Sequence, residues 1–150
     1  MSDENIREIY KVLQTSQDKY IYFKLAAAMT SIAFAITQTK SLKLSITQVP
    51  LGLSVLCWGI SIYFGLTNRA YYNSTLYANV DYIRMKSGQI PSPQYGNHPD
   101  YIQAASEGIK EAMKSNSKKV RRYGSAQTLM FYFGAIFYVV WHVLEMYLRV

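Results

Sequence analysis

The chain contains a single cysteine, Cys57, among its 150 residues, which excludes an intrachain disulfide. Histidine is almost as scarce, and apart from the isolated pair His142 and Glu145, neither His98 nor His142 has Cys, Asp or Glu residues at the spacing of a metal-ligand set. The sequence also lacks a glycine-rich phosphate loop, a nucleophile elbow and a paired-carboxylate motif. These absences predict a protein that is not an enzyme and that has no catalytic residue, metal site or cofactor.

Charged residues are almost missing from three long apolar runs. Residues 125–148 are nearly continuous hydrocarbon and aromatic side chains, residues 49–67 contain no charge, and residues 23–39 contain only Lys24. About 20 helical residues cross the apolar slab of a bilayer, which is about 30 Å thick. We therefore predict three transmembrane helices. The alternative is one or two spans packed on a soluble domain.

The flanking segments continue the helices beyond the apolar runs. Helices are expected over 3–39, 50–87 and 100–149, with a loop over 88–99 that holds three prolines and two glycines. Residues 40–48 predict a tight turn outside the bilayer, and Lys24 is expected to extend its amine to the lipid head groups. The fold class is thus all-α. It is an integral membrane protein whose three transmembrane helices extend into a cytoplasmic helical bundle, forming one membrane domain over residues 1–150.

Apolar side chains at helical spacing indicate how the inner halves of the helices pack. Tyr72, Leu76, Val80 and Ile83 lie along one side of the second helix. We expect the inner halves to bury such stripes against one another below the membrane. The first 22 residues are polar and of mixed charge, which predicts no cleavable signal peptide.

The basic residues predict the orientation. The formal net charge is +7, and all but three of the 16 Lys and Arg residues, Lys40, Lys43 and Arg149, fall on the side of the N-terminus. The positive-inside rule therefore predicts a multi-pass protein of the plasma (inner) membrane, with its N-terminus in the cytoplasm and its C-terminus outside. Tyrosines at the predicted inner ends of the spans agree with this orientation: Tyr20, Tyr22, Tyr71, Tyr72 and Tyr123.

A polar seam runs along the third span and consists of Gln127, Gly134, Tyr138, His142 and Glu145. Their spacing places them on one side of a helix, where ionisable groups avoid hydrocarbon. One interpretation is the lining of a pore or ion path, in which His142 changes charge near neutral pH. The other is that the immersed members hydrogen-bond to a neighbouring helix, while Glu145 pairs with Arg149 at the outer interface.

Small residues four apart mark the other two spans as packing surfaces. The rows are Ala27, Ser31 and Ala35 in the first span, and Cys57, Ser61 and Gly65 in the second. Such rows allow helices to approach closely, either as a hairpin within one chain or between subunits.

The basic cluster lies just before the third span and consists of Lys118, Lys119, Arg121 and Arg122. Anionic lipid explains such a cluster first, because each juxtamembrane Lys or Arg contributes about 1 kcal/mol of attraction to the head groups. An anionic ligand such as a nucleotide signal or nucleic acid is a less favoured partner that stays open.

Two functional hypotheses follow. The first is a small homo-oligomeric membrane protein, a channel or membrane-permeabilising effector with a cytoplasmic regulatory helical part; three spans leave no room for a pore in one chain, so several copies would surround an axis. The second is a non-conducting anchor or scaffold that holds a cytoplasmic partner protein at the inner membrane.

In layout, the chain resembles the small SLATT-type effectors of bacterial antiviral systems, which have membrane spans and a helical cytoplasmic part. This resemblance implies a membrane-disrupting effector in antiviral defence. The third span departs from their two-span plan, and no residue role carries over.

Overall fold

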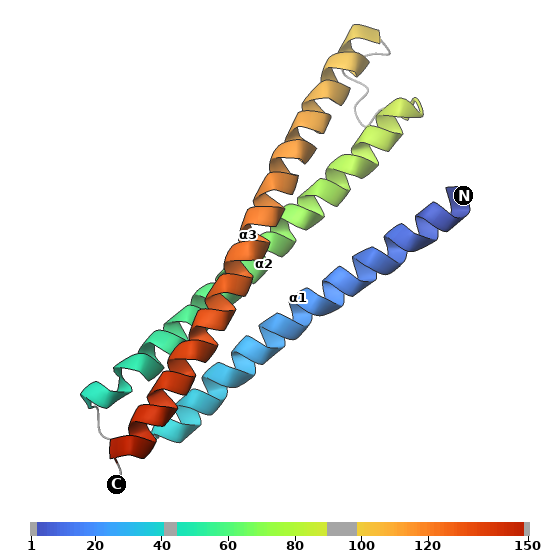
Figure 1. Cartoon of the computed structure of the whole chain (residues 1–150). Coiled ribbons are helices and arrows are strands. Elements are labelled where there is room, and N and C mark those ends of the chain that lie inside the picture. The colour runs from blue at the N-terminus through green and yellow to red at the C-terminus, as the bar shows by residue number, and fades with distance from the viewer. Residues whose placement is uncertain (1–2, 41–44, 90–98, 149–150) are drawn as a thin grey trace. The chain divides into compact units, whose positions relative to one another are not determined.

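Three long helices account for nearly all of the described residues, which are 3–40, 45–89 and 99–148 in the computed structural model (Figure 1). The elements follow in the order α1 (Asp3–Thr39), η1 (Ile46–Gln48), α2 (Val49–Lys86) and α3 (Pro99–Leu148). The described ranges contain no strand, so the predicted all-α class is confirmed. Each of the three helices is long and apolar enough to cross a membrane.

Proline and glycine stand at the helix ends. Pro50 is the second residue of α2 and Pro99 the first of α3, positions where a missing backbone N–H leaves no helical bond unmade. Gly88 follows the end of α2 with a φ of 78°, which glycine adopts without strain. The backbone N–H groups of Gly88 and Gln89 donate to the carbonyls of Met85 and Arg84, at 3.2 and 2.9 Å. These bonds close the last turn of α2.

The connection from α1 to α2 ends in a capped turn. The Ser45 hydroxyl accepts from the Thr47 backbone N–H at 3.2 Å, and Gln48 N–H donates to the Ser45 carbonyl at 3.0 Å. These bonds start η1, which leads directly into α2. Within the predicted tight turn over 40–48, residues 41–44 lie outside the described residues, as do 90–98 of the predicted loop over 88–99.

The helices divide into two compact units. The three-helix unit comprises the described residues of 1–65 and 126–150, and the hairpin unit comprises residues 66–125. The division falls within α2, after Gly65, and within α3, after Ser125.

The three-helix unit has a small core that joins all three helices. Its buried apolar members are Ala28 and Ala35 from α1, Leu51 and Trp58 from α2, and Trp141 from α3. The Tyr138 ring lies at the centre of an aromatic cluster, with ring centroids 6.4 Å from Phe34, 5.9 Å from Trp58 and 5.6 Å from Trp141. These aromatic rings bury more apolar surface between the helices than small residues alone would bury.

The hairpin unit pairs the second half of α2 with the first half of α3. The rings of Tyr71 and Tyr123 stack with centroids 5.6 Å apart and an interplanar angle of 6°. The Lys110 amine lies 5.4 Å from the centroid of the Tyr82 ring. In contrast, Leu76, Val80 and Ile83 of the predicted apolar stripe of α2 are exposed, so the hairpin unit does not bury them.

Candidate functional site

A polar ladder joins α2 to α3. Its donors are Ser54, Ser61 and Asn68, which are seven residues apart on α2. The Ser54 hydroxyl donates to the Gly134 carbonyl at 2.7 Å, and the Ser61 hydroxyl donates to the Gln127 carbonyl at 2.9 Å. In the hairpin unit, the Asn68 side-chain amide donates to the carbonyl of Val120. The acceptors are also seven residues apart, in the reverse order.

The ladder follows from a heptad pattern. The buried positions of α2 alternate in steps of three and four: Leu51, Ser54, Trp58, Ser61, Gly65 and Asn68. The average spacing between these buried positions is 3.5 residues, which keeps one side of a helix facing a supercoiled partner helix. A helix carbonyl has a second lone pair, so each rung adds a bond without breaking one in α3. In lipid, no water competes for these groups.

Two glycines allow the helices to pack closely around the ladder. A Cβ atom on Gly134 would lie 2.5 Å from Cδ1 and Nε1 of Trp58. A Cβ atom on Gly65 would lie 2.5 Å from Nε2 of Gln127. In each pair, a glycine on one helix accommodates a large side chain from the other.

The structure divides the polar seam. Gln127 and Gly134 are buried and face α2, and Tyr138 is half-buried in the aromatic cluster. Glu145 is half-buried near the end of α3, whereas His142 is exposed. The seam residues are therefore not all brought together. Arg149, the expected partner of Glu145, lies outside the described residues.

Gln127 is the most deeply buried large polar residue in the described ranges, with 0% of its surface exposed. Its backbone carbonyl accepts from Ser61, but neither side-chain atom, Oε1 or Nε2, has a hydrogen-bond partner among the described residues. The buried indole N–H groups of Trp58 and Trp141 also have no hydrogen-bond partner among the described residues. An unpaired buried polar group costs about 1–3 kcal/mol.

Lys24 departs from its predicted position. Only 5% of the residue is exposed, and its amine donates to the Thr128 hydroxyl of α3 at 2.9 Å and lies 4.2 Å from the centroid of the Tyr20 ring. The expectation that this side chain extends outward to the head groups is therefore wrong. The hydroxyl and the aromatic ring supply a local polar site for the ammonium group, which hydrocarbon would not.

The small-residue rows are only partly at the helix contacts. Ala35, Ser61 and Gly65 are buried, but Ala27, Ser31 and Cys57 are half-buried. On a helix of 3.6 residues per turn, residues four apart are separated by one full turn plus about 40°. A row with this spacing therefore winds around the helix and leaves the side that contacts the partner helix. The alternating step of the heptad would have identified Ser54 and Asn68, which our sequence analysis did not single out.

The basic cluster lies on the surface of the hairpin unit. Lys118, Lys119, Arg121 and Arg122 are all exposed. The amine of Lys119 lies 4.8 Å from the centroid of the Tyr71 ring, beside the stacked tyrosines. The cluster can therefore present positive charge to lipid head groups or to another anionic surface.

Neither metal-binding groups nor known relatives add a further site. Across residues 3–40, 45–89 and 99–148, no group of three His, Cys, Asp or Glu side chains could hold a metal ion. Comparisons of the chain with protein-family models, with curated proteins and with solved structures find no match. The candidate site is thus defined by geometry alone, as the polar ladder with the residues packed around it.

Proposed function

We propose that this chain is a multi-pass anchor that holds a cytoplasmic partner protein at the plasma (inner) membrane, with its N-terminus in the cytoplasm and its C-terminus outside. The exposed apolar stripe of α2 in the hairpin unit carries this proposal, and the filled interior of the three-helix unit agrees with it. Trp58, Tyr138 and Trp141 occupy the space between the helices, and Gln127 packs against Gly65. A pore within one chain would need that space to be open to water.

The distribution of charge supports contact between the hairpin unit and the lipid head groups, through basic residues next to the spans. Residues 66–80 and 112–125, which adjoin the spans, contain basic residues and no acidic one. Residues 81–111 contain four acidic residues, Asp81, Asp100, Glu107 and Glu111, against three basic ones. Lys118 lies about 10 Å along the helix from the start of the third span, within reach of the negative surface potential of the bilayer. The mixed charge farther out does not favour nucleic acid.

The partner surface that this proposal assigns is the apolar stripe of α2. Leu76, Val80 and Ile83 are exposed, and they lie about 14–24 Å along the helix from the end of the second span. Lipid does not extend to that depth, so an apolar surface there is suited to another helix.

Site-specific photo-crosslinking in cells tests the anchor. A photoreactive amino acid at Val80 should give an adduct with a different protein, whereas the same group at the exposed Glu107 should not. Adducts at Val80 that contain only this chain, or equal yields of heterologous adducts at both positions, would contradict the assignment.

A second candidate function is a homo-oligomeric channel or membrane-permeabilising effector, as in antiviral defence. It is favoured by His142, which is exposed on α3 within the apolar run. A polar group on the outer surface of a span is stabilised when a second copy covers it. Several copies would then enclose a path that one chain does not form.

Ion flux through reconstituted vesicles distinguishes the two functions. The anchor predicts no flux above protein-free vesicles between about pH 5 and pH 8, the range in which histidine changes charge. A channel predicts flux that His142→Leu alters and that Val143→Leu, at the exposed neighbouring position, does not. Flux with this pattern would replace the anchor proposal with the channel.

A further inference from the structure

In the proposed membrane placement, Tyr132 directs its phenol group into the middle of the bilayer. Ser54 of α2 bonds to Gly134 of the antiparallel α3, so Tyr132 lies level with Leu56 of α2. Tyr132 is about 10 Å along α3 from the inner end of the third span, and Leu56 is about 10 Å along α2 from the outer end of the second. Both distances exceed the length of a tyrosine side chain. The hydroxyl therefore does not reach the head groups on either side.

The Tyr132 hydroxyl has no hydrogen-bond partner among residues 3–40, 45–89 and 99–148. The residue is 59% exposed, and its ring centroid lies 6.0 Å from that of the neighbouring Phe131. A serine or threonine hydroxyl can bond to a carbonyl one turn back in its own helix, as Thr39 does with Ala35. The longer tyrosine side chain holds its hydroxyl away from its own backbone. In hydrocarbon no water replaces the missing partner, so the bond requires another helix.

Tyr132 belongs to an exposed, otherwise apolar row of α3, the outer stripe. Its members follow one another in steps of three and four residues and are each between 52 and 59% exposed: Leu129, Tyr132, Ile136, Val139, Val143 and Met146. This is the heptad spacing of a helix that faces a supercoiled partner. The β-branched members have few rotamers to lose in a helix, so they pack at a low cost in entropy.

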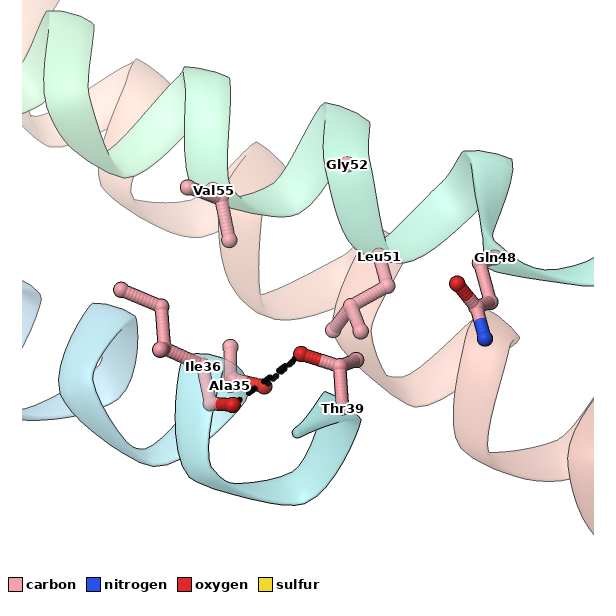
Figure 2. Close-up of a pocket in the computed structure, with 7 residues that line it drawn as sticks. All are labelled: Ala35, Ile36, Thr39, Gln48, Leu51, Gly52 and Val55. Atoms are coloured by element: carbon pink, nitrogen blue, oxygen red, sulfur yellow. Dashed lines mark hydrogen bonds between the residues drawn. The ribbon is translucent and has the colours of Figure 1, made fainter. Parts of the chain in front are cut away.

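Contacts within the chain use other sides of the helices. Gly134 and Trp141 of α3 are buried in the three-helix unit. At the outer ends of α1 and α2, Figure 2 shows Leu51 and Val55 of α2 directed toward Ile36 of α1. The outer stripe thus lies on a side of α3 that no helix of the three-helix unit covers.

We propose that a second copy of this chain covers the outer stripe, so that two α3 helices pair in parallel about a two-fold axis along the membrane normal. All copies insert in the same orientation, so this axis brings each residue of the stripe next to its counterpart at the same depth. A tyrosine hydroxyl both donates and accepts, so the two Tyr132 hydroxyls bond to each other. The inference rests on the membrane placement of the proposed function and goes beyond it, because the partner protein at the apolar stripe of α2 is not involved.

Disulfide crosslinking of single cysteines tests the pairing. The full chain is reconstituted in vesicles in a Cys57→Ala background, with one cysteine introduced on the outer stripe at Ile136, Val139 or Val143. The matched controls place the cysteine at positions of α3 that are exposed outside the stripe: Phe133, Val140 and Leu144. With a membrane-permeant oxidant, we expect the stripe positions to give covalent dimers at several times the yield of the controls.

Tyr132→Phe tests the hydroxyl contact, because it removes one oxygen and keeps the ring. Energy transfer between labelled copies in vesicles measures the dissociation constant of the pair. We expect this constant to rise about 3- to 30-fold, the range for loss of one intramembrane hydrogen bond. Tyr147→Phe is the control and should leave the constant unchanged, because Tyr147 is 79% exposed at the outer end of α3, outside the stripe.

Each other result overturns the inference. No dimers, or equal yields at stripe and control positions, would mean that the copies meet only by random collision, and higher yields at the controls would mean a different contact surface. Stripe dimers that Tyr132→Phe does not weaken would mean that apolar packing joins the copies without the hydroxyls. Reaction of a Val139→Cys thiol with a water-soluble maleimide in intact vesicles would contradict the membrane placement itself, which separates that failure from failure of the pairing.

Discussion

Gln127 carries a fully buried carboxamide into the contact between α2 and α3, and no described residue bonds its side chain. Glycine at position 65 provides the space for that side chain. The residue therefore has two separable roles, because its backbone carbonyl supports the ladder while its side chain fills volume at a cost.

Replacing Gln127 by methionine should stabilise the protein. Met has a similar volume and removes two unpaired polar atoms, so we expect the free energy of unfolding to rise by about 1 kcal/mol. Reversible unfolding in mixed micelles measures the change. Gln38→Met, at an exposed position of α1, is the matched control and should have little effect. A loss of stability in Gln127→Met would show that the carboxamide has a partner.

Gly134 and Gly59 should respond in opposite ways to alanine. A Cβ atom at Gly134 would collide with the Trp58 indole, whereas one at Gly59 meets nothing within 4 Å. We expect Gly134→Ala to lower the free energy of unfolding by about 1–3 kcal/mol through overpacking. Gly59→Ala should raise it by about 0.5–1 kcal/mol, because glycine weakens a helix interior. Equal effects in the same unfolding assay would contradict the close contact at Gly134.

Among the elements, the pairing of α2 with α3 depends on a repeat of seven rather than four. Ser54 and Ser61 occupy equivalent positions of successive heptads, and their acceptors on α3 follow the same period. Side-chain hydroxyls that meet backbone carbonyls disfavour a shift of one residue, because such a shift would place apolar side chains of α2 opposite those carbonyls. Lipid exerts no hydrophobic force between helices, so such bonds and close packing determine the register.

Removing the hydrogen bonds of the polar ladder one at a time should lower the free energy of unfolding at each step. We expect Ser54→Ala and Ser61→Ala each to lower the free energy of unfolding by about 0.6–1 kcal/mol, the typical strength of an intramembrane hydrogen bond. The two changes should add, because the rungs do not share a partner. Ser125→Ala, at an exposed position of α3, serves as the control. No loss in the double variant would mean that packing alone fixes the register.

At the scale of the whole molecule, the proposed topology places the two interhelical connections on opposite sides of the membrane. Residue 46 adjoins the connection between α1 and α2, and the hairpin unit contains residue 115. Three crossings require these positions to differ in accessibility, and in the proposed orientation the hairpin unit, with its excess of basic residues, lies in the cytoplasm.

Cysteine labelling checks this topology. In a Cys57→Ala background, Ile46→Cys and Ser115→Cys place single thiols at two exposed positions, the first of them 86% exposed in the native residue. An impermeant maleimide should label Ile46→Cys on intact cells, and Ser115→Cys only after the membrane is permeabilised. The reverse pattern would invert the orientation. Labelling of both positions on intact cells would contradict the three crossings.

The amino-acid sequence alone determined the all-helical class, the three apolar runs and the asymmetry of charge, because these depend on local hydropathy and on a sum over residues. The long uninterrupted helices also follow from the chain, since proline is confined to positions 50, 91, 93 and 99. Only the tertiary structure decided which sides of the helices meet. The seam residue His142 is exposed while Lys24 is buried, although hydropathy favours the opposite for each. Which side is buried depends on the partner helix and on the seven-residue register, and neither is a property of one helix considered by itself.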